Sequence, residues 1–199
     1  MKIRDLPITS IIGVIIITVF ITFTTISVIL YPLPWSPKTT FLSDFGNMKT
    51  NVYGSKYFNI GLIIAGITII PFYIGLNDWY PEDKLKYLIV IGQLLGIGSG
   101  IALALIGIYP EDFPKDHRFW SYTFFQINFF AMFFINTALL TNKNYSRRVA
   151  IIAYAFLVVT LGLYLINGGA PIVEWLTVSE SLIFAGLLSL ETWWLKDTE

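Results

Sequence analysis

The chain contains no cysteine and only one histidine among its 199 residues. The absence of cysteine excludes disulfides, thiolate metal sites, iron–sulfur clusters and cysteine nucleophiles. A single histidine cannot build a three-histidine zinc site. We therefore expect no cofactor and no transition-metal centre, and few catalytic chemistries remain.

Charge is scarce as well. Only 13% of the residues are charged, whereas an ordinary soluble domain carries about a quarter. Thirteen Lys and Arg balance thirteen Asp and Glu, so no basic excess is available to bind nucleic acid. In contrast, 55% of the residues are hydrophobic, and the mean hydropathy is +0.68. The partner that this composition indicates is membrane lipid, with other membrane subunits as a further possibility.

Six apolar stretches are long enough to cross a bilayer, which takes about 20 residues in a helix. They comprise residues 8–31, 58–76, 85–109, 119–140, 149–166 and 174–195. The longest connecting segment, 32–57, is too short to bury a core of its own. We predict an all-α integral membrane bundle of six transmembrane helices, forming a single domain over residues 1–199.

Six spans place both termini on one side of the membrane, and the distribution of Lys and Arg selects that side. Eight basic residues belong to the side of the termini and five to the other. The first set is Lys2, Arg4, Lys84, Lys86, Lys143, Arg147, Arg148 and Lys196, and the second is Lys38, Lys49, Lys56, Lys115 and Arg118. We predict a multi-pass protein of the cell membrane with cytoplasmic termini. Abundant isoleucine and absent cysteine favour a prokaryotic source.

A stripe of small residues runs along the third span. Gly92, Gly96, Gly100 and Ala104 follow one another at intervals of four residues. This spacing places them on one face of a helix, where they allow a neighbouring backbone to approach closely. We interpret the stripe as a helix-packing surface rather than a functional site.

Polar side chains inside a span are costly and often mark a site. Glu180 lies about 9 Å into the sixth span, at about 1.5 Å per residue. A carboxyl group at this depth should be partnered or protonated. Glu191 is closer to the predicted inner interface, and we expect it to be hydrated.

A second polar group lies at the start of the fourth span. His117, Ser121 and Asn128 share one helical face if the helix extends back to the histidine. Three carboxyl groups lie within six residues of this histidine: Glu111, Asp112 and Asp116.

The first long loop contains the segment Leu42-Ser43-Asp44-Phe45-Gly46. A Ser-Asp-x-Gly sequence is a common turn in which the aspartate accepts backbone hydrogen bonds. Asp44, His117 and Glu180 all belong to the predicted outer side, so the topology permits them to meet there.

Two pairs of segments carry a family resemblance. The first pair is the segment 41–46 with Phe58-Asn59, which opens the second span. The second pair is Gly107-Ile108-Tyr109-Pro110-Glu111-Asp112 with His117. Through these segments and its six-span pattern, the chain resembles the membrane family called domain of unknown function 998. It is more distantly similar to the Frag/DRAM/Sfk family.

The resemblance implies a six-span fold but no settled activity. The Frag/DRAM/Sfk family is associated with lipid-anchor remodelling, phosphoinositide signalling and autophagy. A glutamate in the last span, here Glu180, fits the resemblance, although a basic residue is expected after it and this chain has Ser181. A looser likeness to seven-span ceramidases and progestin receptors implies a mechanism that needs three histidines, which this chain does not have.

The sequence favours a non-catalytic lipid-binding or complex-stabilising membrane protein with a polar pocket at the outer face. In this interpretation Asp44, His117 and Glu180 form a polar pocket for a lipid headgroup. Further ligand-binding candidates are Asn59, Glu111, Asp112, Asp116, Ser121 and Asn128.

Two other functions fit the same residues. A membrane-embedded lipid hydrolase or transferase would use Asp44 or Glu180 as base, His117 as acid or base, and Ser43 as nucleophile or binding hydroxyl. Its variant would hold Ca²⁺ or Mg²⁺ on outer carboxylates. A proton-coupled transporter relaying protons through Glu180 ranks last, because no inverted repeat is visible. The carboxylates of the metal variant are Asp44, Glu111, Asp112 and Asp116.

Overall fold

The structure is a computed structural model that describes residues 6–81 and 83–197. Every regular element in these residues is helical. The α-helices are α1 Ile8–Ile29, α2 Ser55–Ile74, α3 Lys86–Ile108, α4 Pro114–Leu139, α5 Arg147–Asn167 and α6 Pro171–Asp197, with the 3-10 helices η2 Ser43–Gly46 and η3 Gly75–Trp79.

Six helices of the described segments are long and apolar enough to cross a membrane. This confirms the predicted all-helical, six-span fold. The side on which the termini lie stays a prediction, and Lys2 and Arg4, which contribute to it, lie outside the described residues.

Two helices begin earlier than their apolar stretches. Helix α4 starts at Pro114 rather than near residue 119, and α6 starts at Pro171 rather than near residue 174. Proline is favoured in the first helical turn because an N–H at this position would have no partner within the helix. Hydropathy alone therefore misses a polar first turn, and in α4 this turn contains His117.

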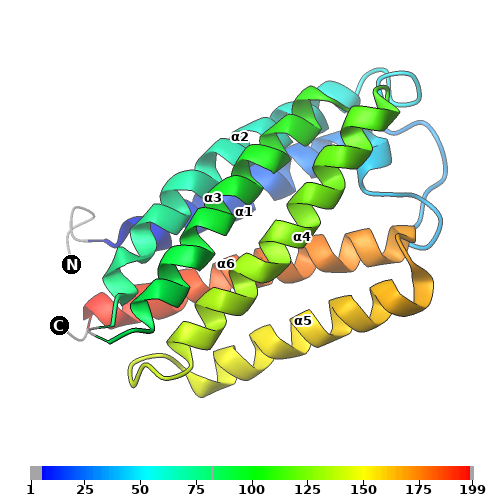
Figure 1. The fold of residues 1–199 in the computed structure, drawn as a ribbon. Helices are drawn as coiled ribbons and strands as arrows, with labels where there is room; N and C mark the ends of the chain where they lie inside the picture. The colour runs from blue at the N-terminus through cyan, green and yellow to red at the C-terminus, as the bar shows by residue number, and fades with distance from the viewer. Residues whose placement is uncertain (1–5, 82, 198–199) are drawn as a thin grey trace.

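The six helices form a closed ring in which neighbours in sequence pack side by side. Helix α1 packs on α2, α2 on α3, α3 on α4, and α4 on α5. Helix α6 closes the ring by packing on both α5 and α1. Figure 1 shows α5 at the lower edge of the bundle, next to α6.

The small-residue stripe of α3 lies against its neighbours in the ring. A Cβ atom on Gly66 of α2 would lie 2.5 Å from the carbonyl oxygen of Gly100 and 2.6 Å from the backbone nitrogen of Ala104. Gly96 also faces α2, and Gly92 faces α4. The absence of side chains at these positions lets the backbones of α2 and α3 touch.

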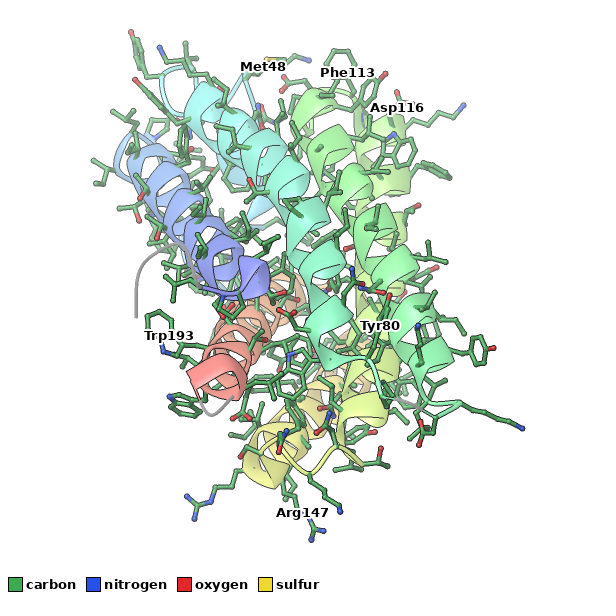
Figure 2. The ribbon with its side chains drawn as sticks, turned by 90° about the vertical axis from the view of Figure 1, so that its left-hand side faces the viewer. Met48, Tyr80, Phe113, Asp116, Arg147 and Trp193 are labelled. Carbon is green, nitrogen blue, oxygen red and sulfur yellow. The ribbon has the colours of Figure 1, made fainter. Side chains whose placement is uncertain are left out.

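The two ends of the ring differ. We call the end at which α1 begins and α6 finishes the terminal end, and the opposite end, which carries Asp44, Glu111 and Glu174, the acidic end. Figure 2 shows Met48, Phe113 and Asp116 at the acidic end and Arg147 at the terminal end. The terminal end is filled by a hydrophobic core that includes Leu76, Trp79, Ile135, Leu139 and Leu188, each almost fully buried.

Polar groups in the terminal half are satisfied within the protein. The indole Nε1–H of Trp79 donates to Thr192 Oγ1 at 2.7 Å. The backbone N–H of Ser146 donates to Glu191 Oε2 at 2.9 Å. The expectation that Glu191 is hydrated is wrong, because its side chain is only 4% exposed. This carboxyl group binds the chain just before α5 begins.

Candidate functional site

The turn that carries Ser43 and Asp44 is held in place by buried amide and hydroxyl groups. Ser27 Oγ and Asn51 Nδ2 both donate to the carbonyl oxygen of Phe45, at 3.0 and 2.9 Å. Asn59 Nδ2 donates to the carbonyl oxygen of Gly46 at 2.9 Å. Asn59, a ligand-binding candidate from the sequence, thus ties η2 to α2. These bonds fix η2 across the acidic end of the ring.

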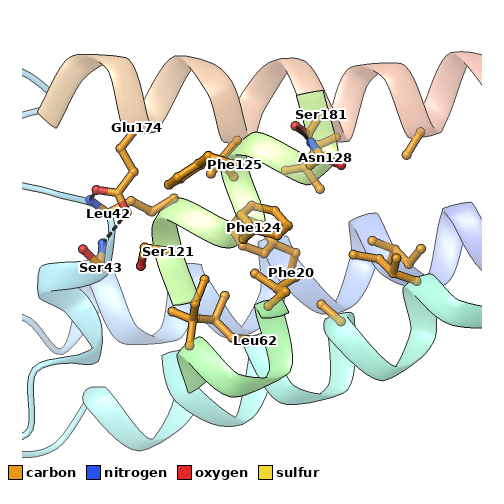
Figure 3. A pocket seen from close by; sticks show the side chains of 18 of the residues that line it. Phe20, Leu42, Ser43, Leu62, Ser121, Phe124, Phe125, Asn128, Glu174 and Ser181 are labelled. Carbon is orange, nitrogen blue, oxygen red and sulfur yellow. Dashed lines mark hydrogen bonds between the residues drawn. The ribbon is translucent and has the colours of Figure 1, made fainter. Parts of the chain in front are cut away.

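A carboxyl group from the last helix joins this turn. The backbone N–H groups of Leu42 and Ser43 donate to Glu174 Oε2 and Oε1, each at 3.2 Å. Figure 3 shows both bonds as dashed lines. Ser43 Oγ donates to Glu111 Oε1 at 3.0 Å, on the turn between α3 and α4. Ser43 therefore lies between two carboxyl groups from distant parts of the chain.

Asp44 lies beside Glu111. Its Oδ2 accepts the backbone N–H of Phe41 at 2.8 Å, and its side chain is hydrogen-bonded to Glu111. Burial, together with the hydrogen bond and negative charge of Asp44, raises the pKa of Glu111 to about 7. The ordinary pKa is 4.5. Glu111 therefore exchanges a proton close to neutral pH.

The remaining acidic-end candidates hold loops or face outward. The ring nitrogen Nδ1 of His117 lies 3.0 Å from the carbonyl oxygen of Tyr109, and the imidazole is within electrostatic range of Asp44. Asp112 Oδ2 accepts the backbone N–H of Met48 at 2.7 Å. Asp116 is exposed at the first turn of α4 (Figure 2).

A cavity of about 80 Å³ lies inside the ring, beneath η2. Five helices line it, all except α5, and most of the lining is apolar. Ser43, Ser121 and Glu174 lie together at one end of it, and Asn128 and Ser181 lie further along (Figure 3). The acidic end therefore contains this cavity beside a hydrophobic core of its own, which includes Phe45, Phe58 and Leu62.

Glu180 does not join this group. Its carboxyl group accepts a hydrogen bond from Thr160 of α5, and it lines a second, smaller cavity between α4, α5 and α6. Asn128 and Ser181 line both cavities, and Asn128 Nδ2 donates to Ser181 Oγ at 2.9 Å. The structure thus brings Ser43, Asp44 and Glu111 together and places Glu180 elsewhere.

Residues 13–194 match the family described as "Protein of unknown function (DUF998)". The chain belongs to this family. No curated protein and no solved structure gives a significant match to it. The resemblance to the DUF998 family is therefore confirmed, whereas the distant relation to Frag/DRAM/Sfk proteins stays a prediction.

The described carboxyl groups of this DUF998 protein are engaged in contacts other than a cluster of metal ligands. No group of three or more His, Asp or Glu side chains there is arranged to hold a metal ion. Asp44 and Glu111 are joined to each other, Asp112 binds a backbone N–H, and Asp116 faces outward. Binding of Ca²⁺ or Mg²⁺ stays an untested expectation.

Glu174 is the functional candidate that sequence reasoning did not single out. It lies in the first turn of α6, where a carboxylate is ordinary. Its importance comes from Leu42 and Ser43, which are 132 and 131 residues away in the sequence. The helix-start proline, Pro171, is the only local signal that places it at the end of the ring.

Proposed function

We propose that this DUF998 protein binds a membrane lipid, with the lipid's polar group at Ser43, Ser121 and Glu174 and the adjoining carbons in the cavity. The observation that supports this proposal most directly is the combination of an apolar cavity with hydroxyl and carboxyl groups gathered at one end. Ligand sites typically have this composition, a mostly apolar lining with a few polar groups that fix orientation.

The size of the cavity limits what it accepts. An engineered protein cavity of about 150 Å³ binds benzene, so about 80 Å³ holds only a few carbon atoms. The rest of a lipid chain would remain outside the cavity, in the bilayer. The proposal therefore concerns the polar group and the first part of the chain.

Photo-crosslinking tests lipid binding directly. The purified protein, reconstituted in lipid nanodiscs, is incubated with a long-chain alcohol that carries a diazirine close to its hydroxyl group. We expect crosslinks on cavity-lining residues of α1, α4 and α6, such as Phe20, Phe124 and Leu182. Excess unlabelled alcohol should remove them. Crosslinks confined to exposed outer faces such as that of α5 would overturn the proposal.

A lipid hydrolase or transferase is the second candidate, and one contact favours it. Ser43 Oγ donates to Glu111, whose pKa of about 7 suits a general base at neutral pH. Catalysis at Ser43 would also need donors for a developing oxyanion. The nearest backbone N–H groups, those of Leu42 and Ser43, already bind Glu174. For this reason lipid binding without turnover ranks first.

A measurement of lipid turnover distinguishes a lipid-binding protein from a lipid hydrolase or transferase. Membrane lipids are compared by mass spectrometry after expression of the wild type, Ser43→Ala and Glu111→Gln. A binding protein leaves the lipid composition unchanged by either substitution. A product that is present with the wild type and missing with both variants would favour the enzyme.

A further inference from the structure

We propose that the cavity selects lipids whose polar group donates hydrogen bonds and carries no negative charge, with a protonated amine as the preferred class. This inference rests on the proposed lipid-binding function and specifies its ligand. It is carried by the position of Glu174, the free hydroxyl of Ser121 and the placement of basic residues around the acidic end.

Glu174 has acceptor capacity left for a ligand. An ionised carboxylate offers about four acceptor sites. Each oxygen of Glu174 receives one backbone N–H, at 3.2 Å, and the same side chain lines the cavity. A donor group entering the cavity can therefore bind Glu174 without displacing the loop.

Ser121 offers a second group at the same end of the cavity. Within the described segments, its hydroxyl makes no hydrogen bond to the protein. The hydroxyl of Ser43 donates to Glu111, and the same side chain is hydrogen-bonded to Glu174. An ammonium group carries three donors. It can thus bind Glu174 with one donor and Ser121 with another, while its alkyl chain enters the apolar part of the cavity.

The charges around this end oppose an anionic group. Asp44 and Glu111 lie directly behind Ser43, so three carboxyl groups surround it. The basic side chains of the same end are all exposed, and in the described segments none pairs with Glu174 or Glu111. They are Lys38, Lys49, Lys56, Lys115 and Arg118. A phosphate or carboxylate ligand would therefore enter without a cationic partner, at a cost in desolvation and repulsion.

An ammonium ligand reverses this balance. A hydrogen bond between an ammonium and a carboxylate is charge-assisted and about twice as strong as a neutral one. The selectivity among ligands with the same chain should thus follow the charge of the polar group, from amine through alcohol to carboxylate.

Three probes of equal chain length test this order: dodecylamine, dodecanol and dodecanoate. Each competes with the photoreactive alcohol for the full chain in nanodiscs of zwitterionic lipid. We expect dodecylamine to compete about tenfold more strongly than dodecanol, a difference of about 1.4 kcal/mol. Dodecanoate should compete least.

Substitutions of two glutamates on the same helix provide the matched comparison. Glu174→Gln should remove the preference for the amine while dodecanol still competes. Glu180→Gln, which alters the separate cavity near Thr160, should keep the preference. Glu111→Gln removes a neighbouring negative charge without changing a residue that lines the cavity. It provides a second test in case Glu174→Gln does not fold. We expect Glu111→Gln to reduce the preference by a smaller factor.

The outcomes distinguish this inference from the proposed function. If none of the three probes competes, the lipid-binding proposal fails and the selectivity fails with it. If all three compete equally, or dodecanoate competes best, lipid binding stands and the selectivity is wrong. A preference for amine that survives both Glu174→Gln and Glu111→Gln would show partitioning of amine into the bilayer and would overturn the inference.

Discussion

Each end of the helical ring has a glutamate that accepts hydrogen bonds from the backbone of a distant segment, but only the one at the acidic end lines a cavity. At the terminal end, Glu191 accepts the N–H of Ser146 beside a filled core. At the acidic end, Glu174 accepts the N–H groups of Leu42 and Ser43 and also lines the cavity. Both carboxylates bind the backbone, so this kind of contact alone does not mark a site. The space next to it makes the difference.

The largest loss of stability should come from truncating a side chain in the hydrophobic core of the terminal end. Trp79 is 1% exposed, packs in the core and donates to Thr192. Trp79→Ala should lower the free energy of unfolding by about 3–5 kcal/mol, because it leaves a cavity and removes the hydrogen bond to Thr192. Denaturant unfolding in detergent, followed by circular dichroism, measures this loss.

Trp35 provides the control at the acidic end. This side chain is 41% exposed and stacks on Trp175. Trp35→Ala should cost about 1 kcal/mol, the size of an aromatic pair. Equal losses for the two tryptophans would contradict the difference between the ends.

Enlarging one alanine at each end gives a more direct comparison. Ala65 lines the cavity, whereas Ala153 lies in the filled core, and both are almost fully buried. Ala153→Leu should destabilise by about 1–3 kcal/mol, the usual cost of overpacking. Ala65→Leu should change the stability less, because its added carbons occupy empty space, and it should weaken crosslinking by the photoreactive alcohol. Denaturant unfolding measures the change in stability of both variants, and the crosslinking assay measures binding of the photoreactive alcohol. If Ala65→Leu were the more destabilising change, the cavity would not accept added volume.

A pH dependence should belong to the acidic end. The pKa of Glu111 is raised from 4.5 to about 7, mainly by burial, so the folded chain binds more protons than the unfolded chain between these values. Its contribution to stability is therefore largest at low pH and decreases as the pH rises through this window. The titratable groups that interact electrostatically with Glu111 are Asp44, Glu174 and Tyr31.

Thermal unfolding in detergent at a series of pH values measures this slope. Glu111→Gln keeps an acceptor for Ser43 and should flatten the slope across the window. Asp116→Asn, which changes an exposed carboxyl at the start of α4, should leave it as in the wild type. An unchanged slope in Glu111→Gln would assign the pH dependence to another group.

Single-cysteine labelling, which should perturb the protein least, tests which end of the ring faces the outside of the cell. Because the chain has no cysteine, a single introduced cysteine gives an unambiguous label. Met48→Cys lies at the exposed acidic end, and Asn144→Cys lies in the exposed loop of the terminal end. An impermeant maleimide added to intact cells should label only Met48→Cys. Labelling of Asn144→Cys alone would reverse the predicted orientation.

The fold could be predicted from the sequence because hydropathy acts along the chain, over stretches of about 20 residues. The Ser43–Asp44 turn and the carboxyl groups before α4 could also be recognised, since turn and helix-start residues are local signals. Whether they meet depends on the packing of the ring. Hydropathy gave no reason to favour Glu174 over Glu180, since both carboxyl groups belong to the same span.

The rotation and start of α6 decide between these two glutamates. The earlier start of this helix, at Pro171, brings Glu174 to the level of η2. Glu180 instead faces Thr160 on α5. Glu191 was misjudged for a related reason: its partner, Ser146, lies 45 residues away, and distance from the span centre says nothing about such a partner.

The bonds between Glu174 and the first loop also set an order of assembly. Their partners are separated by 131 and 132 residues, and the contact of Ser10 with Ser189 spans 179. During synthesis the first five helices are made before the last one can close the ring. Until α6 arrives, the N–H groups of Leu42 and Ser43 lack their carboxylate. The proposed lipid site would therefore be completed only when the last helix has been inserted, because α6 supplies Glu174, Val178, Ser181, Leu182 and Ala185 of the cavity lining. A chain truncated before α6 would keep the rest of the lining but would lack Glu174.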